Sequence, residues 1–339
     1  MDYNGANILA PMVRVGTLPM RLLAAEYGAH IVYTDELVDK RLMGCVRSLN
    51  GQAGTVDFTD AKGVVLLRTL PGEARRTVAQ IGTSAPELAL AAASVVAGDV
   101  GAIDVNMGCP LPFSVSGGMG SALLGKPETA ADILSTLRRN LHTGLSCKIR
   151  LLATPASTVE FARRMEACGV DAVAVHGRHV AERSHKHAAH WDAISAVVAA
   201  LGIPVIANGD VLAPADFGRI RAATGAAGVM AARGAQWNPS IFRPDGLLPG
   251  RTVRAAYVRC ALAAANGVGN TKFCLREMLI KDCGLEGAEG RAVNAAKTMA
   301  QVAHIYGCPL PSWMRETAGD EGGEEEASDG AAASSGGGD

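Results

Sequence analysis

Polar residues and glycines follow short apolar segments at several points along this chain, in positions suited to binding a ligand. The run NMGCP covers 106–110, HGR covers 176–178 and NGD covers 208–210, each after a stretch rich in valine, isoleucine and alanine. Burying polar groups beside such stretches without partners costs free energy, so their repetition indicates a bound polar ligand. A plain turn or a core ion pair is the alternative for each group taken alone.

The side chains at these positions suit the polar edge of a flavin and its phosphate. Gln80, Asn106, Lys148 and His176 offer donors and acceptors for an isoalloxazine ring and a ribityl chain. A lysine near the N1–C2 carbonyl of the ring would stabilise the reduced anion. Glycine turns after the last two apolar segments, together with Arg233, would present donors to a phosphate group.

Cys109 stands between Gly108 and Pro110 and precedes a glycine loop at 117–120. A thiol on a flexible loop above a flavin can donate a proton as a general acid. The alternative is an inert buried cysteine, and we assign that state to the other seven cysteines, which include no C-x-x-C pair. This usage indicates reduced thiols in an intracellular protein.

Three histidines, His185, His187 and His190, have the composition of a metal cluster without its setting. Their spacing suits a loop rather than one face of a helix, and we count no carboxylate or cysteine as close to them. We therefore expect no metal site.

Eight short apolar runs alternate with helical patterns and would position these groups. The runs do not alternate in polarity, which favours a parallel sheet covered on both faces. The expected strands are 8–11, 31–35, 78–81, 102–106, 146–150, 172–176, 204–208 and 228–232. The expected helices are 17–27, 86–96, 127–140, 158–168, 191–201 and 214–223. This order predicts a (β/α)8 TIM barrel with a hairpin or loop insertion at 39–76, and a doubly wound open sheet is the alternative.

Beyond about residue 251 the pattern becomes helical, at 253–265, 270–280 and 290–306. Residues 251–315 hold 9 basic and 4 acidic side chains, which indicates either a surface facing nucleic acid or an ordinary solvated helix face. The last stretch is rich in Gly, Ala, Ser and acidic residues and cannot form a core. The expected domains are a barrel at 1–245, a small all-helical domain at 246–312 and a disordered acidic tail at 313–339.

The overall composition excludes several classes of protein. The chain is 48% hydrophobic, and its 40 glycines follow no short period, which excludes a wholly disordered chain, a collagen and a solenoid. No apolar run reaches 18 residues and the N-terminus lacks a signal pattern, so we expect no membrane partner and a cytoplasmic protein, with the nucleus as an alternative. The net charge of −1 hides about +7 over residues 1–315.

Taken together, these motifs resemble the tRNA dihydrouridine synthases. The resemblance is carried by LAPMV at 9–13, DVNMGCP at 104–110, GGMG at 117–120, HGR at 176–178 and IANGD at 206–210. It runs from residue 7 to about 308. The stretches at 10–16 and 236–240 are similar to the eukaryotic branch that acts on uridine 20 of the tRNA D-loop.

This resemblance implies an enzyme that binds FMN in its barrel, takes electrons from NADPH and grips tRNA with its helical domain. Reduced FMN would give a hydride to C6 of a flipped-out uracil, and Cys109 would give a proton to C5. The implied FMN contacts are Pro11, Met12, Val13, Gln80, Asn106, Lys148, His176, Asn208, Gly209, Asp210, Ala232 and Arg233. The candidate tRNA contacts are Arg178, Arg254, Lys272 and Arg276, and we expect a monomer.

Two departures from the family pattern affect the expected grip on tRNA. Residues 111–116 contain no Lys or Arg, whereas relatives usually carry one there, and no double-stranded-RNA-binding domain follows the helical part. Barrel and helical domain would therefore hold tRNA by themselves. Two other functions stay open: a flavin barrel that acts on a free pyrimidine, and a tRNA-binding protein that has lost turnover.

Overall fold

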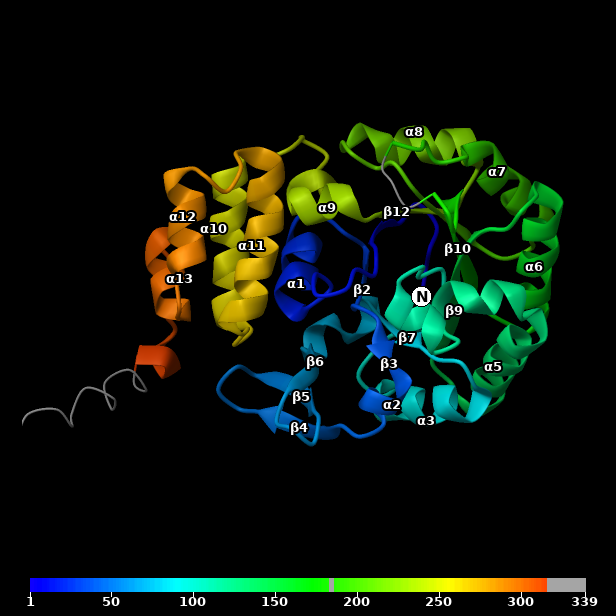
Figure 1. The fold of residues 1–339 in the computed structure, drawn as a ribbon, viewed down its shortest axis with the longest axis horizontal. Coiled ribbons are helices and arrows are strands. Elements are labelled where there is room, and N and C mark those ends of the chain that lie inside the picture. Colours follow the sequence, from blue (N-terminus) through cyan, green and yellow to red (C-terminus); the bar gives the residue numbers. More distant parts are fainter. Residues whose placement is uncertain (183–185, 316–339) are drawn as a thin grey trace, which may run out of the picture.

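Eight parallel strands close into a ring in the structure, a computed structural model that describes residues 1–182 and 186–315. The order is β2-β1-β12-β11-β10-β9-β8-β7, and pairing of β2 with β7 closes the ring (Figure 1). The strands are β1 (Asn7–Leu9), β2 (Ile31–Tyr33), β7 (Thr77–Gly82), β8 (Ala102–Met107), β9 (Gly144–Leu151), β10 (Ala172–His179), β11 (Val205–Asn208) and β12 (Gly228–Ala231). The closed ring confirms the predicted TIM barrel, and the open sheet is wrong.

Alternation along each strand divides the side chains between the inside of the barrel and the layer under the helices. In β10, Ala174 lies in the inner cluster, whereas Val173 and Val175 belong to the larger core that includes the helices. In β9, Cys147 lies in that larger core and Lys148 faces a pocket inside the barrel mouth, as the sequence predicts. Small or apolar residues therefore fill the barrel interior, and the inward polar residues come at the carboxyl ends of the strands.

Helices cover the outside of the ring at close to the predicted positions (Figure 1). They are α1 (Leu18–Glu26), α3 (Pro86–Val96), α5 (Pro127–Asn140), α6 (Pro155–Ala167), α7 (Trp191–Ala200) and α8 (Ala215–Thr224). Helix α6 begins three residues before the predicted start, because Thr154 caps it by accepting a hydrogen bond from the backbone N–H of Ser157.

The predicted insertion after the second strand is an antiparallel sheet beside the barrel. Short elements β3 (Leu37–Val38) and α2 (Asp39–Leu42) lead into β4 (Val46–Asn50), β5 (Thr55–Thr59) and β6 (Val65–Thr69). Arg68 of β6 pairs with Asp57 at 2.6 Å, and its Nη1 donates to the carbonyls of Ala264 and Ala265. The insertion thereby braces a turn of the C-terminal helices against the barrel.

The C-terminal region is helical, as expected, but its last predicted helix is divided. It contains α10 (Gly250–Ala263), α11 (Val268–Asp282), α12 (Ala288–Ala295) and α13 (Met299–Ile305), and α10 packs on α1 of the barrel. The single helix predicted at 290–306 is wrong, because Thr298 caps a new helix by accepting from Gln301 N. The sequence analysis also missed the short helices α4 (Pro112–Ser116) and α9 (Arg233–Trp237) and the 3-10 turns at Pro71–Arg76, Gly120–Gly125 and Pro239–Phe242.

Two further expectations concern membrane-spanning helices and the C-terminal tail. No helix within residues 1–182 and 186–315 has the length and apolar character needed to cross a membrane. The predicted disordered tail falls, from residue 316 onward, outside the described residues.

Gly16 fixes the close approach of the β1–α1 turn to the end of β2. A Cβ atom there would lie 2.4 Å from the backbone nitrogen of Asp35 and 2.6 Å from the carbonyl carbon of Thr34. We expect Gly16→Ala to lower the free energy of unfolding by about 1–3 kcal/mol, measured by urea denaturation. Gly98→Ala is the matched control, since its Cβ would meet nothing within 4 Å. Equal losses for the two variants would contradict this interpretation.

Candidate active site

Two adjoining pockets open at the carboxyl ends of the barrel strands. We call them the central pocket, of about 200 Å³, and the side pocket, of about 210 Å³. They share Arg150, His176, Asn208 and Ala232 in their walls. The strand register explains the shared wall, because His176 is the direct neighbour of Asn208 on β11 and of Arg150 on β9.

Most of the residues predicted to bind the cofactor line one of these pockets. The central pocket holds Pro11, Val13, Gln80, Asn106, Lys148, His176, Asn208 and Ala232, and the side pocket adds Gly209, Asp210 and Arg233. Met12 is the exception, since its side chain is half-buried against the apolar core and lines neither pocket.

Lys148 is a half-buried cation in the wall of the central pocket. Burial lowers the pKa of its ammonium group to about 8, with a further lowering by Arg150 and an opposing effect of Asp104. Within the described residues its Nζ has no hydrogen-bond acceptor. A buried ammonium group in this state favours a ligand that presents an acceptor atom.

His176 and Gln80 have hydrogen-bond polarities set by their neighbours. Burial, together with nearby cations led by Lys148, holds the pKa of His176 well below its ordinary value, so the ring is neutral. Arg178 Nη1 lies 3.3 Å from His176 Nε2, which assigns the ring hydrogen to Nδ1. Gln80 Nε2 donates to Asp104 at 2.9 Å, which leaves the Gln80 carbonyl oxygen as the acceptor for a ligand.

Asp104 connects side chains next to the central pocket through hydrogen bonds. Its carboxylate accepts from Gln80 and, at 2.6 Å, from the hydroxyl of Ser146. Burial raises the pKa of this carboxyl to about 6, while Ser146, Gln80 and Lys148 act to lower it. Asp104 thus orients one predicted cofactor contact, Gln80, and supplies a negative charge near another, Lys148.

Cys109 lies at the rim of the central pocket in a turn ordered by Asn106. The Oδ1 atom of Asn106 accepts from the backbone N–H groups of Gly108 and Cys109, at 3.0 and 3.1 Å. Partial burial is the largest cause of a raised pKa for the Cys109 thiol. The group is therefore protonated at neutral pH, which is the state a general acid requires.

The loop after Cys109 approaches it closely and is apolar on its surface. A Cβ atom on Gly120, which has φ of +58°, would lie 2.6 Å from the carbonyl oxygen of Cys109, so the contact requires glycine. Leu111, Phe113 and Val115 of this loop are exposed. The loop after Cys109 thus presents apolar side chains to solvent.

Arg178 occupies the wall of the side pocket rather than an outer surface. It is only 2% exposed, its Nε donates to the carbonyl of His187 at 2.7 Å, and its Nη2 pairs with Asp210. Asp210 also accepts from the backbone N–H of Ala189 at 2.6 Å. Arg233 has a side chain 34% exposed and lies 3.6 Å from Asp210, so it remains the cation in this pocket most open to a ligand.

Comparison with known proteins matches this site to a family. A family model described as dihydrouridine synthase (Dus) covers residues 8–270. The chain belongs to this family. It is 37% identical, over 90% of its length, to a Schizosaccharomyces pombe protein named tRNA-dihydrouridine(20) synthase, NAD(P)+. A Saccharomyces cerevisiae protein of the same name is 35% identical over 82% of the chain.

The length of the chain differs from that of these dihydrouridine synthases. It spans 64% of the fission yeast relative, slightly under two thirds, and 78% of the budding yeast relative. A human protein named tRNA-dihydrouridine(20a/20b) synthase, NAD(P)+-like, is 32% identical over 69% of this chain and 70% of its own length.

The basic side chains of the helical region divide into buried and surface groups. Arg254 is 2% exposed and pairs with Asp282 at 2.7 Å and Glu289 at 2.8 Å, so the structure places it away from any RNA surface. Lys272 donates from Nζ to the carbonyls of Asn294 and Ala296 and is half-buried. Arg276 is exposed and bonds only the side chain of Asn294 among its recorded partners, which leaves it as the most accessible of the three.

Two charged residues of the central pocket, Glu36 and Arg150, were absent from the predicted site. Glu36 follows β2, the one strand end whose polar residues the sequence analysis did not consider. Arg150 stands two residues after Lys148 on the same strand face, and its Nε donates to the carbonyl of Gly108 at 2.8 Å. Period-two alternation from Lys148 is the signal that would have found it.

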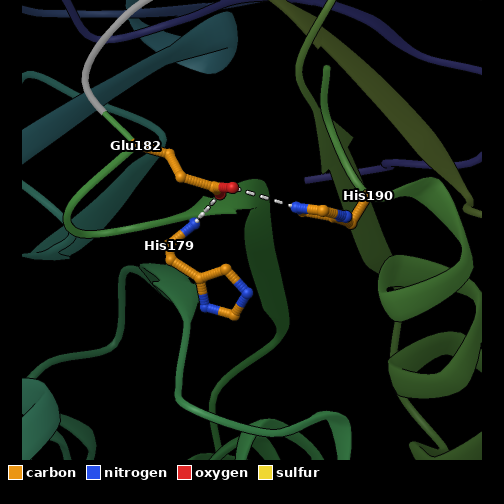
Figure 2. Close-up of side chains that lie close together, drawn as sticks. All are labelled: His179, Glu182 and His190. Atoms are coloured by element: carbon orange, nitrogen blue, oxygen red, sulfur yellow. Dashed lines mark hydrogen bonds and ion pairs between the residues drawn. The ribbon is translucent and has the colours of Figure 1, made fainter. Parts of the chain in front are cut away.

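In the structure, His190 of the predicted histidine cluster lies close to Glu182 and His179. Figure 2 shows Glu182 between His179 and His190, and it accepts from the backbone N–H of His179 and from the ring of His190, at 2.7 and 3.2 Å. His185 lies outside the described residues. Glu182 is thus a carboxylate close to His190, contrary to the expectation from the sequence, and it connects the end of β10 with His190.

Proposed function

We propose that this chain reduces the C5=C6 bond of a D-loop uridine in tRNA to 5,6-dihydrouridine, with FMN as cofactor and NADPH as reductant. The observation that carries the proposal is the meeting, at one barrel mouth, of the thiol of Cys109, whose pKa is raised, and the ammonium group of Lys148, whose pKa is lowered. The names of the yeast relatives support tRNA as substrate, position 20 as target and NAD(P)+ as the oxidised co-substrate.

The donor set of the two pockets fits FMN. Lys148 and the neutral His176 offer hydrogen-bond donors to carbonyl and nitrogen acceptors of the ring, and the oriented Gln80 offers an acceptor to a ring N–H. Arg233 in the side pocket would suit the phosphate group of the cofactor. When bound and reduced, FMN supplies a hydride.

The chain's own residues would contribute binding, orientation and a proton. Cys109 would transfer its thiol proton to C5 of the uracil, and the turn made by Asn106 fixes the backbone from which that thiol extends. The uracil must leave its stack to enter a pocket inside the barrel. The exposed apolar side chains of the Cys109 loop, such as Phe113, offer a surface on which unstacked bases can pack.

The remaining predictions complete the proposal. Arg276 and Lys272 are the candidate tRNA contacts that the structure leaves near the surface, and we assign tRNA binding to the barrel mouth together with the helical region at 246–312. We propose a monomer located in the cytoplasm.

One combined experiment tests this function. The purified protein should show a flavin spectrum, and NADPH oxidation should depend on unmodified tRNA and yield dihydrouridine, measured by mass spectrometry of digested tRNA. Reduction of a free pyrimidine without tRNA would favour the alternative flavin enzyme. Tight tRNA binding with bound flavin but without dihydrouridine would favour a binding protein that has lost turnover.

A further inference from the structure

The carboxyl group of Glu36 stands beside Cys109, and the reaction proposed above gives it no role. Glu36 lies in the turn between β2 and β3 and lines the central pocket with Cys109 and Asn106. Ser114 of the loop after Cys109 donates to Glu36 Oε1 at 3.2 Å. The carboxyl group also interacts with the side chains of Asn106 and Cys109. Segments from two separate parts of the chain therefore meet at this thiol.

Gly82 and Gly120 have no side chains, and this provides the space that the side chains of Glu36, Ser114 and Cys109 occupy. A Cβ atom on Gly82, at the end of β7, would lie 2.5 Å from Glu36 Oε1. A Cβ atom on Gly120 would lie 2.5 Å from Ser114 Oγ and 3.0 Å from Cys109 Cβ. A side chain at Gly82 would have to displace the carboxyl group of Glu36, and one at Gly120 would also meet the backbone of Cys109, so both glycines border this packing closely.

One oxygen of this carboxyl group lacks a hydrogen bond. Among the described residues, Glu36 Oε2 is buried and has no partner. Such an atom costs free energy unless it takes up a proton or meets a donor. Burial raises the pKa of Glu36, and the contacts with Asn106, Cys109 and Ser114 act in the opposite direction. The group therefore takes up a proton more readily than an exposed glutamate does.

The other charged groups facing this pair are cations of β9. Lys148 lines the same pocket, and the negative thiolate form of Cys109 favours its charged state. Arg150 also lines the pocket, and its guanidinium donates to the carbonyls of Gly108 and His179. Glu36 is the acidic residue in the wall of the central pocket.

We propose that Glu36 is the positioning residue of Cys109, whose carboxyl group keeps the thiol protonated between turnovers and returns a proton to it after each one. The proposal rests on the function proposed above. In the reaction the S–H bond of Cys109 breaks as a C5–H bond of the product forms, which leaves a thiolate. The carboxylate of Glu36 then takes up a proton from solvent and transfers it to that sulfur, which restores the thiol and leaves Glu36 ionised again.

The electrostatic reason is that a carboxylate and a thiolate in contact repel each other. Two such groups do not ionise independently, so one proton is retained by the pair over a wide pH range. Consistently, the negative charge of Glu36 contributes to the raised pKa of the Cys109 thiol, after the larger contribution of burial. A general acid held in this way is ready before the substrate enters.

The test measures the thiol itself, with FMN-loaded wild-type protein, Glu36→Gln and Glu36→Asp. Alkylation of Cys109 by iodoacetamide is followed against pH, with the Cys109 peptide quantified by mass spectrometry because the chain has 8 cysteines. We expect Glu36→Gln to move the alkylation midpoint to lower pH and to speed alkylation near neutral pH about threefold or more, because thiolate is the reactive form. Glu36→Asp keeps the charge one methylene further away and should fall between the two.

Uridine reduction in tRNA is measured on the same preparations. Glu36→Gln should lower its rate and shift its pH profile in the same direction as the alkylation profile, a change that loss of packing alone would not produce. The unfolding midpoint and the retained flavin show whether each variant is folded. If Glu36→Gln does not fold, wild type is compared with Glu36→Asp instead.

The outcomes separate this proposal from the function on which it rests. Alkylation profiles that coincide for wild type and Glu36→Gln, or for wild type and a folded Glu36→Asp where Glu36→Gln does not fold, overturn the proposal, whatever the tRNA assay shows. A shifted alkylation profile supports it. Absence of uridine reduction by the wild-type protein, together with a shifted alkylation profile, counts against the proposed function and leaves the pairing of Glu36 with the thiol established.

Discussion

Cys109→Ala is expected to retain bound FMN and to reduce uridine in tRNA at a rate roughly 100-fold or more below that of the wild type. The magnitude is that of a missing general acid. Flavin binding should survive because the contacts proposed for FMN come from other residues, among them Lys148, His176 and Arg233. The rate is measured as dihydrouridine formed in single turnovers of the pre-reduced enzyme, which separates proton donation from reduction by NADPH.

Cys283→Ala is the matched control for this prediction. Cys283 is an exposed free cysteine at the end of α11, so the same chemical change there should leave the rate unaltered. An unchanged rate in Cys109→Ala would remove the thiol from the proton-donating role. Loss of flavin from the same variant would instead assign Cys109 to cofactor binding.

The barrel and most of its site could be predicted from the sequence, because the ends of the strands indicate both the fold and the position of the site. Short runs of valine, isoleucine and alanine set the strands, and residues such as Asn106 and Asn208 that follow or end them lie at the mouth in a parallel barrel. Fold and site therefore depend on the same boundaries. The predicted helix starts at Pro86 and Pro127 coincide with those of the structure for a local reason, since proline is well suited to the first turn.

The parts that could not be predicted depend on contacts between distant segments. Glu36 joins Ser114, and Arg254 joins Glu289, across intervals that no local periodicity connects. Charge counts gave Arg254 the same weight as Arg276, although one is buried in ion pairs and the other is exposed. An excess of basic residues in a helical region therefore predicts a nucleic-acid-binding surface only when the residues held in internal ion pairs are left out of the count.

Arg254 gives the second large effect, on stability rather than on tRNA binding. Arg254→Ala removes the partner of Asp282 and the nearer of the two arginine partners of Glu289, which keeps Arg251 at 3.4 Å; the two carboxyl side chains are 45% and 16% exposed. Breaking a buried ion pair in this way costs about 3–5 kcal/mol, and the exposure of Asp282 places the expected loss near about 3 kcal/mol. The free energy of unfolding, from urea denaturation near neutral pH, measures it.

The pH dependence of the free energy of unfolding is an independent test of the ion pair between Arg254 and Glu289. Hydrogen bonds from Arg254, together with the effects of Tyr306 and the charge of Arg251, outweigh burial, the largest single influence, and hold the pKa of Glu289 below its ordinary value. A carboxyl group with a lowered folded-state pKa stabilises the protein above its ordinary pKa, and this contribution is lost as the pH falls through the lowered value. Arg254→Ala should therefore flatten the acid limb of the stability profile, and an acid limb as steep as in the wild type would contradict the pairing.

Arg276→Ala is the matched variant, because it removes the same charge from the surface of the same helical region. Its free energy of unfolding should stay within about 0.5 kcal/mol of the wild type, since its recorded partner is the exposed side chain of Asn294. Its tRNA affinity should fall, with a salt slope reduced by about one unit if Arg276 neutralises a phosphate. If Arg254→Ala instead keeps full stability and loses tRNA affinity, the guanidinium must leave its two carboxylates when RNA binds, and the assignment of Arg254 to the core would be wrong.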